Sequence, residues 1–220
     1  KYFFDLELSS SSSSNISNIE FKSLIIDLIN KEGLSLLTWN KNSIEVKNRV
    51  NFLNHHNKIS KNFSDEFLLS DMKNWLETYL DDIKSIKDLE KLDLYKILFS
   101  SLSWEEQKLI DELAPNFIKV PSGSMIKVDY TNLDVAVLAV KIQELFGLNQ
   151  TPKILNNSFD LQIHLLSPAL RPIQITFDLK SFWLNSYDEV RKELRGKYKK
   201  HYWPENPFEA QATYKTKKNM

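Results

Sequence analysis

The sequence predicts an α+β protein: a helical segment followed by a compact α+β unit of short antiparallel hairpins with two packed helices. Three observations lead to this prediction. Apolar residues recur at helical spacing as far as Pro115, short strand-like runs separated by turn residues begin at residue 116, and a long amphipathic run lies near the end of the chain. The 220 residues are enough for one large domain or two modest ones.

The first 18 residues read as a strand followed by a linker. Residues 1–8 alternate apolar and polar side chains, which is typical of a half-buried strand. The serine run at 9–14 cannot bury apolar surface, and such runs behave as flexible linkers. Because the sequence opens on this strand without a start methionine, we expect residues 1–18 to be the end of a preceding β-domain in a longer protein.

Residues 19–115 are expected to form the helical segment. Apolar residues share one face of the first helix, and Gly33 stands where that helix would end. Ser43 can cap a second helix. Ser103 and Glu106 have the spacing of a capping box at the start of the last one.

Residues 116–204 are expected to form the compact α+β unit. Two short apolar runs flank Pro121-Ser-Gly-Ser124, which is a hairpin pattern with a glycine in the turn. A second hairpin is expected over residues 153–166, around a pair of asparagines, and Pro172–Phe177 reads as a further strand.

Two helices are expected to pack on these strands. The first covers Val135–Leu145, where apolar residues recur at helical spacing before Gly147. The second covers residues 179–198 and carries a stripe of apolar residues beside a row of cations. Residues 205–220 read as a basic tail.

Charge and composition restrict the class of protein only in part. The 29 Lys and Arg residues balance 29 Asp and Glu residues, but residues 191–220 hold nine of the cations and three of the acids. A basic segment on an acidic body indicates an anionic partner. The absence of cysteine excludes disulfides and thiolate metal sites and suits a reducing, cytoplasmic location. The longest apolar run, about eight residues, predicts no membrane span.

The motifs predict no catalytic, metal or cofactor site in this chain. None of the four glycines stands in a phosphate-binding loop, so no ATP-hydrolysing site is expected. Of the four histidines, His55 and His56 are adjacent and would point about 100° apart on a helix, which suits a metal ion poorly. Ser122 and Ser124 flank a glycine in a turn pattern, whereas a nucleophile elbow needs glycine on both sides of the serine. We therefore expect that the chain is not an enzyme by itself.

The basic helix is the candidate functional surface, and three interpretations of it stay open. Its cations share one face and can contact phosphates, where each neutralised charge releases counterions. These candidate nucleic-acid-binding residues are Arg191, Lys192, Arg195, Lys199 and Lys200. Aromatic residues anchor many protein interfaces, and the candidate interaction residues are Trp183, Tyr198, Tyr202 and Trp203. The plainest interpretation is a helix that packs on the sheet and leaves its cations in solvent.

Three groups of motifs follow one another along residues 21–207. The first runs from Leu102-Ser-Trp104 to Val120-Pro-Ser-Gly-Ser124, and the second from the apolar run at 137 to Arg171-Pro172. The third and most specific is Ser186-Tyr-Asp-Glu-Val-Arg-Lys-Glu-Leu-Arg-Gly-Lys-Tyr198 followed by His201-Tyr-Trp-Pro204. Together they resemble the C-terminal region of the bacterial HrpB-type ATP-dependent helicases, which belong to the DExH group of superfamily 2. The chain uses Lys, Asn and Ile where that family tends to use Arg and Ala.

The resemblance implies the accessory C-terminal part of an ATP-dependent, RNA-directed helicase. It places ATP and Mg²⁺ in motor domains upstream of these residues, and it carries over no catalytic residue because the motor motifs do not occur here. The implied partners are the upstream helicase domains and RNA. We expect the chain to support the motor core and to add basic surface for nucleic-acid binding. The alternative is a protein–protein interaction module that docks the helicase core or an external partner.

Overall fold

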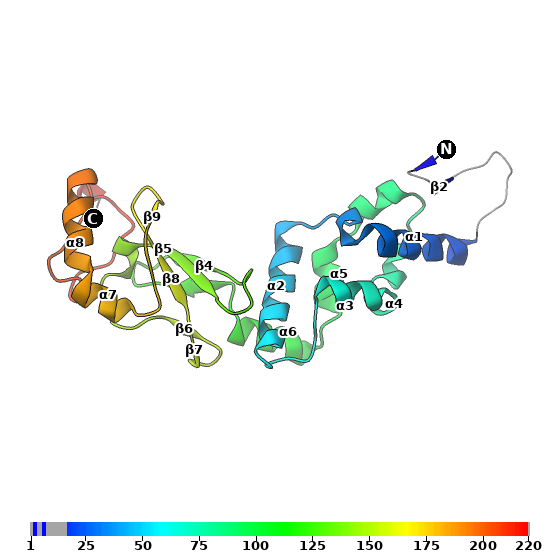
Figure 1. Ribbon diagram of the computed structural model, residues 1–220, viewed down its shortest axis with the longest axis horizontal. Coiled ribbons are helices and arrows are strands. Elements are labelled where there is room, and N and C mark those ends of the chain that lie inside the picture. The colour runs from blue at the N-terminus through cyan, green and yellow to red at the C-terminus, as the bar shows by residue number, and fades with distance from the viewer. Residues whose placement is uncertain (1, 4–5, 8–16, 220) are drawn as a thin grey trace. The chain divides into compact units, whose positions relative to one another are not determined.

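The computed structural model describes residues 2–3, 6–7 and 17–219 (Figure 1). These residues belong to two compact units, and each unit combines two stretches of the chain. Unit 1 takes its described residues from Lys1–Ile44 and Ser64–Ser101, and unit 2 takes them from Glu45–Phe63 and Leu102–Met220. The division differs from the predicted boundary at residue 115, because most of helix α2 and all of helix α6 belong to the unit that contains the sheet.

Unit 1 is helical, as expected for this part of the chain. Its helices are α1 (Asn18–Glu32), η1 (Leu34–Leu36), α3 (Asp65–Ser70), α4 (Met72–Trp75), η2 (Glu77–Leu80), η3 (Ile86–Lys91) and α5 (Leu94–Ser100), where η marks a 3-10 helix. Strands β1 (Tyr2–Phe3) and β2 (Leu6–Glu7) pair antiparallel with each other, so the described residues here form two paired strands and not the predicted single strand. The predicted serine linker lies outside the described residues.

Local signals define the helix ends of unit 1. Ser17 and Glu20 form a capping box at the start of α1, since the Ser17 side chain accepts from the Glu20 amide and the Glu20 carboxylate accepts from the Ser17 amide. Gly33 ends the helix with φ of 86°, a conformation that favours glycine. The prediction that this helix stops at Gly33 is therefore confirmed. In the core, the Trp75 indole donates to the Leu68 carbonyl at 2.8 Å.

Unit 2 is built on a five-stranded sheet, which confirms the α+β class. Its helices are α2 (Lys41–His55, which begins in unit 1), α6 (Trp104–Leu113), η4 (Ile142–Leu145), α7 (Leu179–Asn185), α8 (Tyr187–Lys197) and η5 (Lys217–Asn219). Its strands are β3 (Phe117–Lys119), β4 (Met125–Asp129), β5 (Val137–Lys141), β6 (Lys153–Ile154), β7 (Phe159–Asp160), β8 (Gln162–Leu166) and β9 (Pro172–Thr176).

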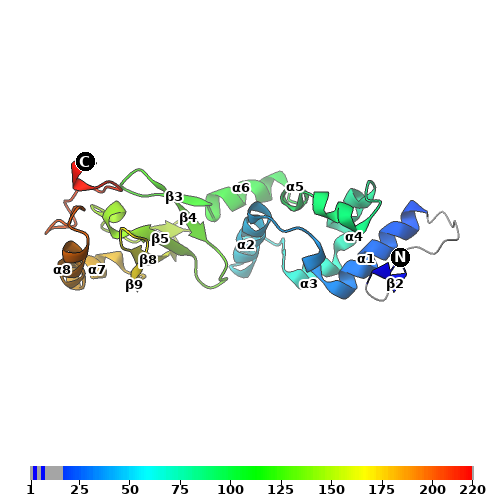
Figure 2. The same ribbon diagram turned by 90° about the horizontal axis from the view of Figure 1, so that it is seen from above.

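The sheet is mixed in direction. Its order is β3-β4-β5-β8-β9, and the hairpin of β6 and β7 stands apart as its own two-stranded sheet. Neighbouring strands run antiparallel except β5 and β8, which are parallel. The first predicted hairpin is confirmed by β3 and β4, and the predicted strand at 172–177 is confirmed by β9. The second hairpin is confirmed only for β6 and β7, because β8, the rest of its expected second strand, joins the five-stranded sheet. Figures 1 and 2 show α7 and α8 beyond one end of the sheet.

The helix predicted over Val135–Leu145 is wrong. Residues Val137–Lys141 form strand β5, and only Ile142–Leu145 coil into the short helix η4. Burial along β5 alternates, with Leu138 and Val140 buried and Ala139 exposed, which is the period of a strand. A short apolar run fits both periods, and here the pairing with β8 across the sheet decides between them.

Arg49 connects helices α2 and α6 within unit 2. Its Nε donates to the Ala114 carbonyl at 2.7 Å, and its Nη2 donates to the Ile110 carbonyl at 3.0 Å and to the Asp111 carboxylate at 2.6 Å. The side chain is only 6% exposed. The guanidinium therefore satisfies the Ala114 carbonyl, which lies just past the C-terminal end of α6, and adds a second donor to the Ile110 carbonyl, which already accepts from the Ala114 amide.

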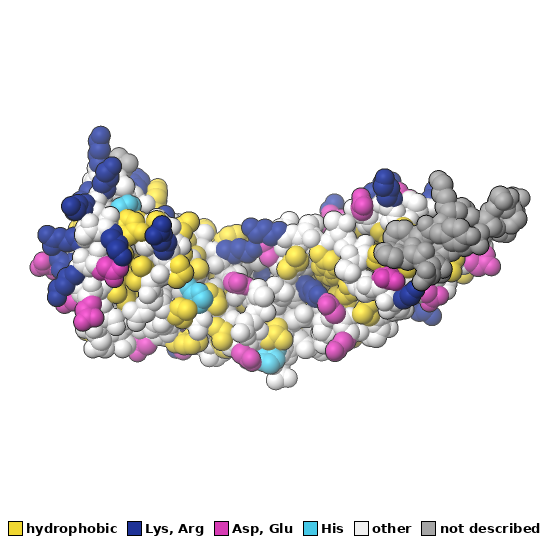
Figure 3. Space-filling model, turned by 45° about the horizontal axis from the view of Figure 1, so that its top comes forward, with side chains coloured by type: hydrophobic (Ala, Val, Ile, Leu, Met, Phe, Trp, Pro, Cys, Tyr) yellow, Lys and Arg dark blue, Asp and Glu magenta, His cyan; other side chains and the backbone are white. Residues whose placement is uncertain are grey.

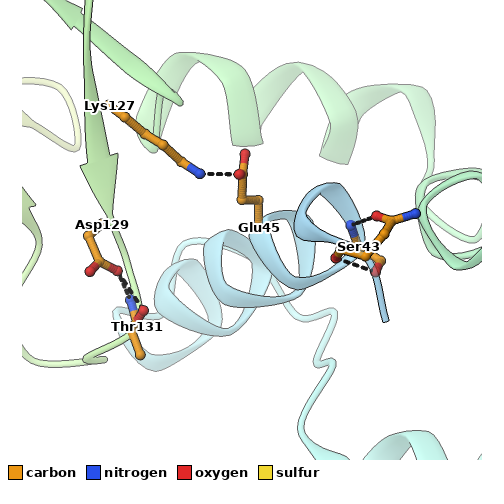
Figure 4. Close-up of polar contacts among 6 residues, drawn as sticks. Ser43, Glu45, Lys127, Asp129 and Thr131 are labelled. Carbon is orange, nitrogen blue, oxygen red and sulfur yellow. Dashed lines mark hydrogen bonds and ion pairs between the residues drawn. The ribbon is translucent and has the colours of Figure 1, made fainter. Parts of the chain in front are cut away.

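The beginning of α2 and the adjacent strand are held by polar contacts (Figure 4). The Asn40 side chain accepts from the Ser43 amide at 2.9 Å, and the Ser43 hydroxyl donates to the Asn40 carbonyl at 2.8 Å. Asn40, and not the predicted Ser43, therefore caps this helix. On the next turn, Glu45 forms an ion pair with Lys127 of β4.

None of the helices in the described part of the chain combines the length and the apolar character that crossing a membrane requires.

Candidate nucleic-acid interface at the end of unit 2

The basic helix predicted over residues 179–198 is two helices. Helix α7 ends at Asn185 and α8 begins at Tyr187, with Ser186 between them at φ of −117°. Asp178 caps α7 by accepting from the Ser181 amide at 2.8 Å. The periodic stripe located the buried face correctly, because Tyr187 and Leu194 are buried, but periodicity does not report a break of one residue.

An aromatic cluster fixes α7 and α8 to the sheet unit. The Phe146 ring lies 5.9 Å from both Trp183 and Tyr187, and the latter two rings are 5.3 Å apart. The Trp183 indole donates to the Leu148 carbonyl at 2.9 Å, and the Tyr187 hydroxyl donates to the Pro204 carbonyl at 3.0 Å. The cluster thus holds both helices and the segment that follows them.

Alkaline pH is expected to destabilise unit 2 through Tyr187. Burial raises the pKa of this phenol well above its usual value of 10.0. The folded state therefore keeps the proton while the unfolded state releases it, so stability should fall as the pH rises above about 10. Urea unfolding of the wild type and of Tyr187→Phe between pH 8 and 11 checks this. The variant should lose less stability than the wild type over that interval; an equal loss would contradict the assignment.

The candidate interaction residues serve mainly inside the unit. Trp183 and Trp203 are 4% and 6% exposed, so their indoles are core groups and do not form a docking surface for a partner. The Trp203 indole donates to the Tyr198 carbonyl at 3.1 Å, and the Tyr198 hydroxyl donates to Ser167 Oγ at 3.3 Å. Tyr202 is half-buried, with its ring 6.2 Å from that of Phe146.

Arg191, one of the predicted phosphate contacts, has partners within the unit. Its Nε donates to the Trp203 carbonyl at 3.2 Å, and its Nη2 lies 2.9 Å from the Glu205 carboxylate. The side chain is 13% exposed. Arg191 therefore ties α8 to the segment after it, and its guanidinium is already occupied by protein groups.

The other predicted cations are exposed in the structure. They are Lys192, Arg195, Lys199 and Lys200. Two nearby acids are paired with other cations, since Glu193 pairs with Lys197 at 2.5 Å and Glu205 pairs with Arg191, while Asp188 and Glu189 lie in the first turn of α8. Within the part of the chain that the structure describes, none of these four cations has an acidic side chain within ion-pair distance.

The C-terminal segment adds two cations that sequence reasoning had assigned to a separate tail. The Lys217 amide donates to the Lys200 carbonyl at 2.9 Å, which places Lys217 and Lys218 beside the end of α8. Both side chains are exposed. Figure 3 shows Lys and Arg side chains gathered at this end of unit 2. We call this surface the basic end, and it consists of Lys192, Arg195, Lys199, Lys200, Lys217 and Lys218.

The segment after residue 204 packs on the sheet unit instead of trailing from it. The Gly147 amide donates to the Pro207 carbonyl at 2.8 Å, and the Thr213 amide donates to the Gln143 carbonyl at 2.9 Å. Gly147 has φ of 79°, and a Cβ there would meet the Ala210 carbonyl oxygen at 3.3 Å. The sequence shows the glycine at position 147, but it does not show that Pro207, about sixty residues further along the chain, is the residue whose carbonyl the glycine amide contacts.

The turn containing Ser122 has a structural explanation. The Ser122 hydroxyl donates to the Glu144 carboxylate at 2.9 Å and lies 3.0 Å from Ser124 Oγ. Gly123 has φ of 87°, as the turn between β3 and β4 requires. The hydroxyl thus joins the hairpin turn to η4, and the prediction of a turn is confirmed.

This architecture belongs to a known class of helicase regions. Residues 75–207 match the family described as the ATP-dependent helicase C-terminal region, HrpB_C. The match covers more than half of the chain, so the chain belongs to this family, which confirms the resemblance found in its motifs.

The relatives of the chain are HrpB helicases. It is 36% identical over 203 residues to the ATP-dependent RNA helicase HrpB of Escherichia coli (strain K12), covering 90% of this chain and 25% of that relative. A crystal structure of the E. coli DExH-box NTPase HrpB matches with a TM-score of 0.84 and 33% identity, over 96% of this chain and 26% of that one. A crystal structure of the E. coli DEAH/RHA helicase HrpB matches with a TM-score of 0.73 and 32% identity. This match covers 88% of this chain and 25% of that one. The chain thus spans about a quarter of the length of these relatives.

Proposed function

We propose that this chain is the accessory C-terminal part of an ATP-dependent RNA helicase and that its basic end binds the phosphate backbone of RNA. The relative named above is an ATP-dependent RNA helicase, which motivates RNA as the ligand. In this proposal ATP and Mg²⁺ act only in upstream motor domains, and the chain itself catalyses no reaction. Its role is to support the motor core and to extend the nucleic-acid path.

The exposed cations of the basic end carry the proposal. Four of them follow one another on α8 and the turn after it, and two more come from the folded-back C-terminal segment. Two of the three acids among residues 191–220 are already paired with Lys197 and Arg191. The positive charge of the surface is therefore not neutralised locally and can attract a polyanion.

Reversing the four helical cations should weaken RNA binding and its dependence on salt. The variant replaces Lys192, Arg195, Lys199 and Lys200 by glutamate. Each phosphate contact that is lost should flatten the slope of log affinity against log salt by about 0.7 for a single strand. Fluorescence anisotropy with a labelled twelve-nucleotide RNA between 50 and 300 mM salt gives the slope.

A matched control separates this site from general electrostatics. It replaces four exposed lysines outside the basic end by glutamate, namely Lys58, Lys73, Lys84 and Lys87. Both variants change the net charge by the same amount. If the basic end is the binding site, only the first variant should flatten the salt slope by more than the change of about 0.7 that one lost phosphate contact produces. Equal slopes in the two variants would refute the proposed interface.

Docking through the aromatic residues has less support. Two of the four candidate aromatic side chains are buried, and the other two are partly covered by the same unit. Hot spots of protein interfaces need exposed groups that a partner can bury. We therefore retain RNA as the ligand in the proposal.

A further inference from the structure

One face of the five-stranded sheet in unit 2 is only partly covered by the rest of the unit. Residues directly opposite each other in neighbouring strands point to the same face, so the register assigns each side chain to one face or the other. The face that holds Val128, Leu138, Val140, Ile163 and Leu165 is buried. Every strand residue on the other face is at least partly exposed, and we call this second face the open face.

The middle of the open face is a flat row across three strands. Ala139 of β5 stands opposite His164 of β8, which stands opposite Ile175 of β9. Ala139 is exposed and small, and Ile175 is 54% exposed. His164 Nε2 lies 2.9 Å from the Gln162 amide oxygen, a contact that orients the imidazole. A small, an aromatic and an aliphatic side chain in one row form a shelf on which a planar base can stack.

The charges of the open face favour a polyanion. Lys127 is paired with Glu45, and Asp129 accepts from the Thr131 amide at 2.9 Å, so these two charges are engaged locally (Figure 4). Lys119 and Lys141 are the remaining cations in the strand residues of this face.

The open face continues into the basic end. Lys141 follows Ala139 by two residues on β5 and therefore lies on the same face. Burial lowers the pKa of the His201 imidazole, and the nearby charge of Lys141 lowers it further. His201 follows Lys200 directly, so Lys141 links the row to the cations after α8. Hydrophobic side chains lie beside the cations at this end of the unit in Figure 3. Cations for phosphates and a shelf for bases are thus contiguous.

We propose that the open face is the base-stacking platform for a single RNA strand whose phosphates are held by the basic end. The row of Ala139, His164 and Ile175 receives the bases, and Lys141 guides the backbone from the row to the cations of α8. The inference rests on the proposed function, because it assigns the bases of the same ligand to a second surface. Stacking accepts every base, so this platform should bind without a sequence code.

The test compares two ligands of equal charge. One is a twelve-nucleotide oligoadenylate RNA, and the other is an abasic ribose-phosphate strand of the same length. The wild-type chain should bind the base-containing strand about tenfold more tightly or better, because stacking of each base contributes roughly 1–3 kcal/mol. In His164→Ala/Ile175→Ala this preference should shrink severalfold while the salt slope stays unchanged. Trp104→Ala, which removes an exposed aromatic of α6 outside the sheet, should keep the full preference.

The outcomes distinguish the two proposals. Equal binding of both strands by the wild type, with a slope that depends on the basic end, would leave the proposed function standing and reject the platform. A normal preference in the double variant would reject it as well and would favour a protein segment as the occupant of this face. Failure of the charge-reversed variant to change the slope would instead reject the basic end itself. Both platform side chains are partly exposed, and thermal unfolding of the variant verifies that it folds.

Discussion

Replacing Arg49 by methionine is expected to lower the free energy of unfolding of unit 2 by about 3 kcal/mol. The substitution keeps much of the apolar stem but removes the donors that satisfy the Ala114 and Ile110 carbonyls. The Ile110 carbonyl would keep its bond from the Ala114 amide, but the buried Ala114 carbonyl would lose its Arg49 donor, which costs more than the loss of an average hydrogen bond. Arg49→Lys should recover only part of the loss, because one ammonium group cannot reproduce the several N–H donors that the planar guanidinium directs at its partners.

The free energy of unfolding is measured by titration with urea, with hydrogen exchange of the amides of unit 2 as the readout. Lys108→Met is the matched control, because Lys108 is exposed on α6 and contacts only exposed groups among the described residues, namely the Glu112 carboxylate and the Trp104 ring. It should change stability by less than about 0.5 kcal/mol. A loss below about 1 kcal/mol in Arg49→Met would show that other groups replace the donor of the Ala114 carbonyl.

Trp183→Ala is expected to cost about 4 kcal/mol. The indole is buried, contacts three aromatic rings and donates to the Leu148 carbonyl, so its removal leaves a cavity and an unsatisfied acceptor. Because the same cluster holds α8 in place, the variant should also bind RNA more weakly although no cation is changed.

The control for this variant is Trp104→Ala. The Trp104 side chain is 70% exposed, so its loss should change the midpoint of urea unfolding little. If the two variants had similar midpoints, the cluster around Trp183 would not be the main stabilising contact of the two helices. Intact stability with weakened RNA binding in Trp183→Ala would instead indicate a direct contact with the ligand.

The features that were predicted correctly depend on a few adjacent residues. The capping box of Ser103 and Glu106 is present, with the Ser103 amide 2.8 Å from the Glu106 carboxylate. The hairpin turn at Gly123 and the helix end at Gly33 both use a positive φ that favours glycine. Neighbours along the chain encode such features, so their prediction needs no knowledge of the fold.

The features that were missed depend on residues distant in the sequence. The apolar spacing predicts a helix at the position of strand β5, because it does not reveal the parallel partner β8. The pattern of α8 predicts a free cation at Arg191, because nothing in it indicates Glu205 as a partner. The open face was not foreseen either, since the register that assigns residues to it exists only in the assembled sheet.

The sequence by itself determined the fold class, the helicase family and the excess of positive charge near the C-terminal end. The tertiary structure alone decided which cations and rings face solvent. Folding back of the C-terminal segment placed Lys217 beside Lys200, and packing of Trp183 and Trp203 removed two aromatic side chains from the surface. The physical reason is that exposure results from contacts between distant segments, whereas charge and periodicity are properties of the chain itself.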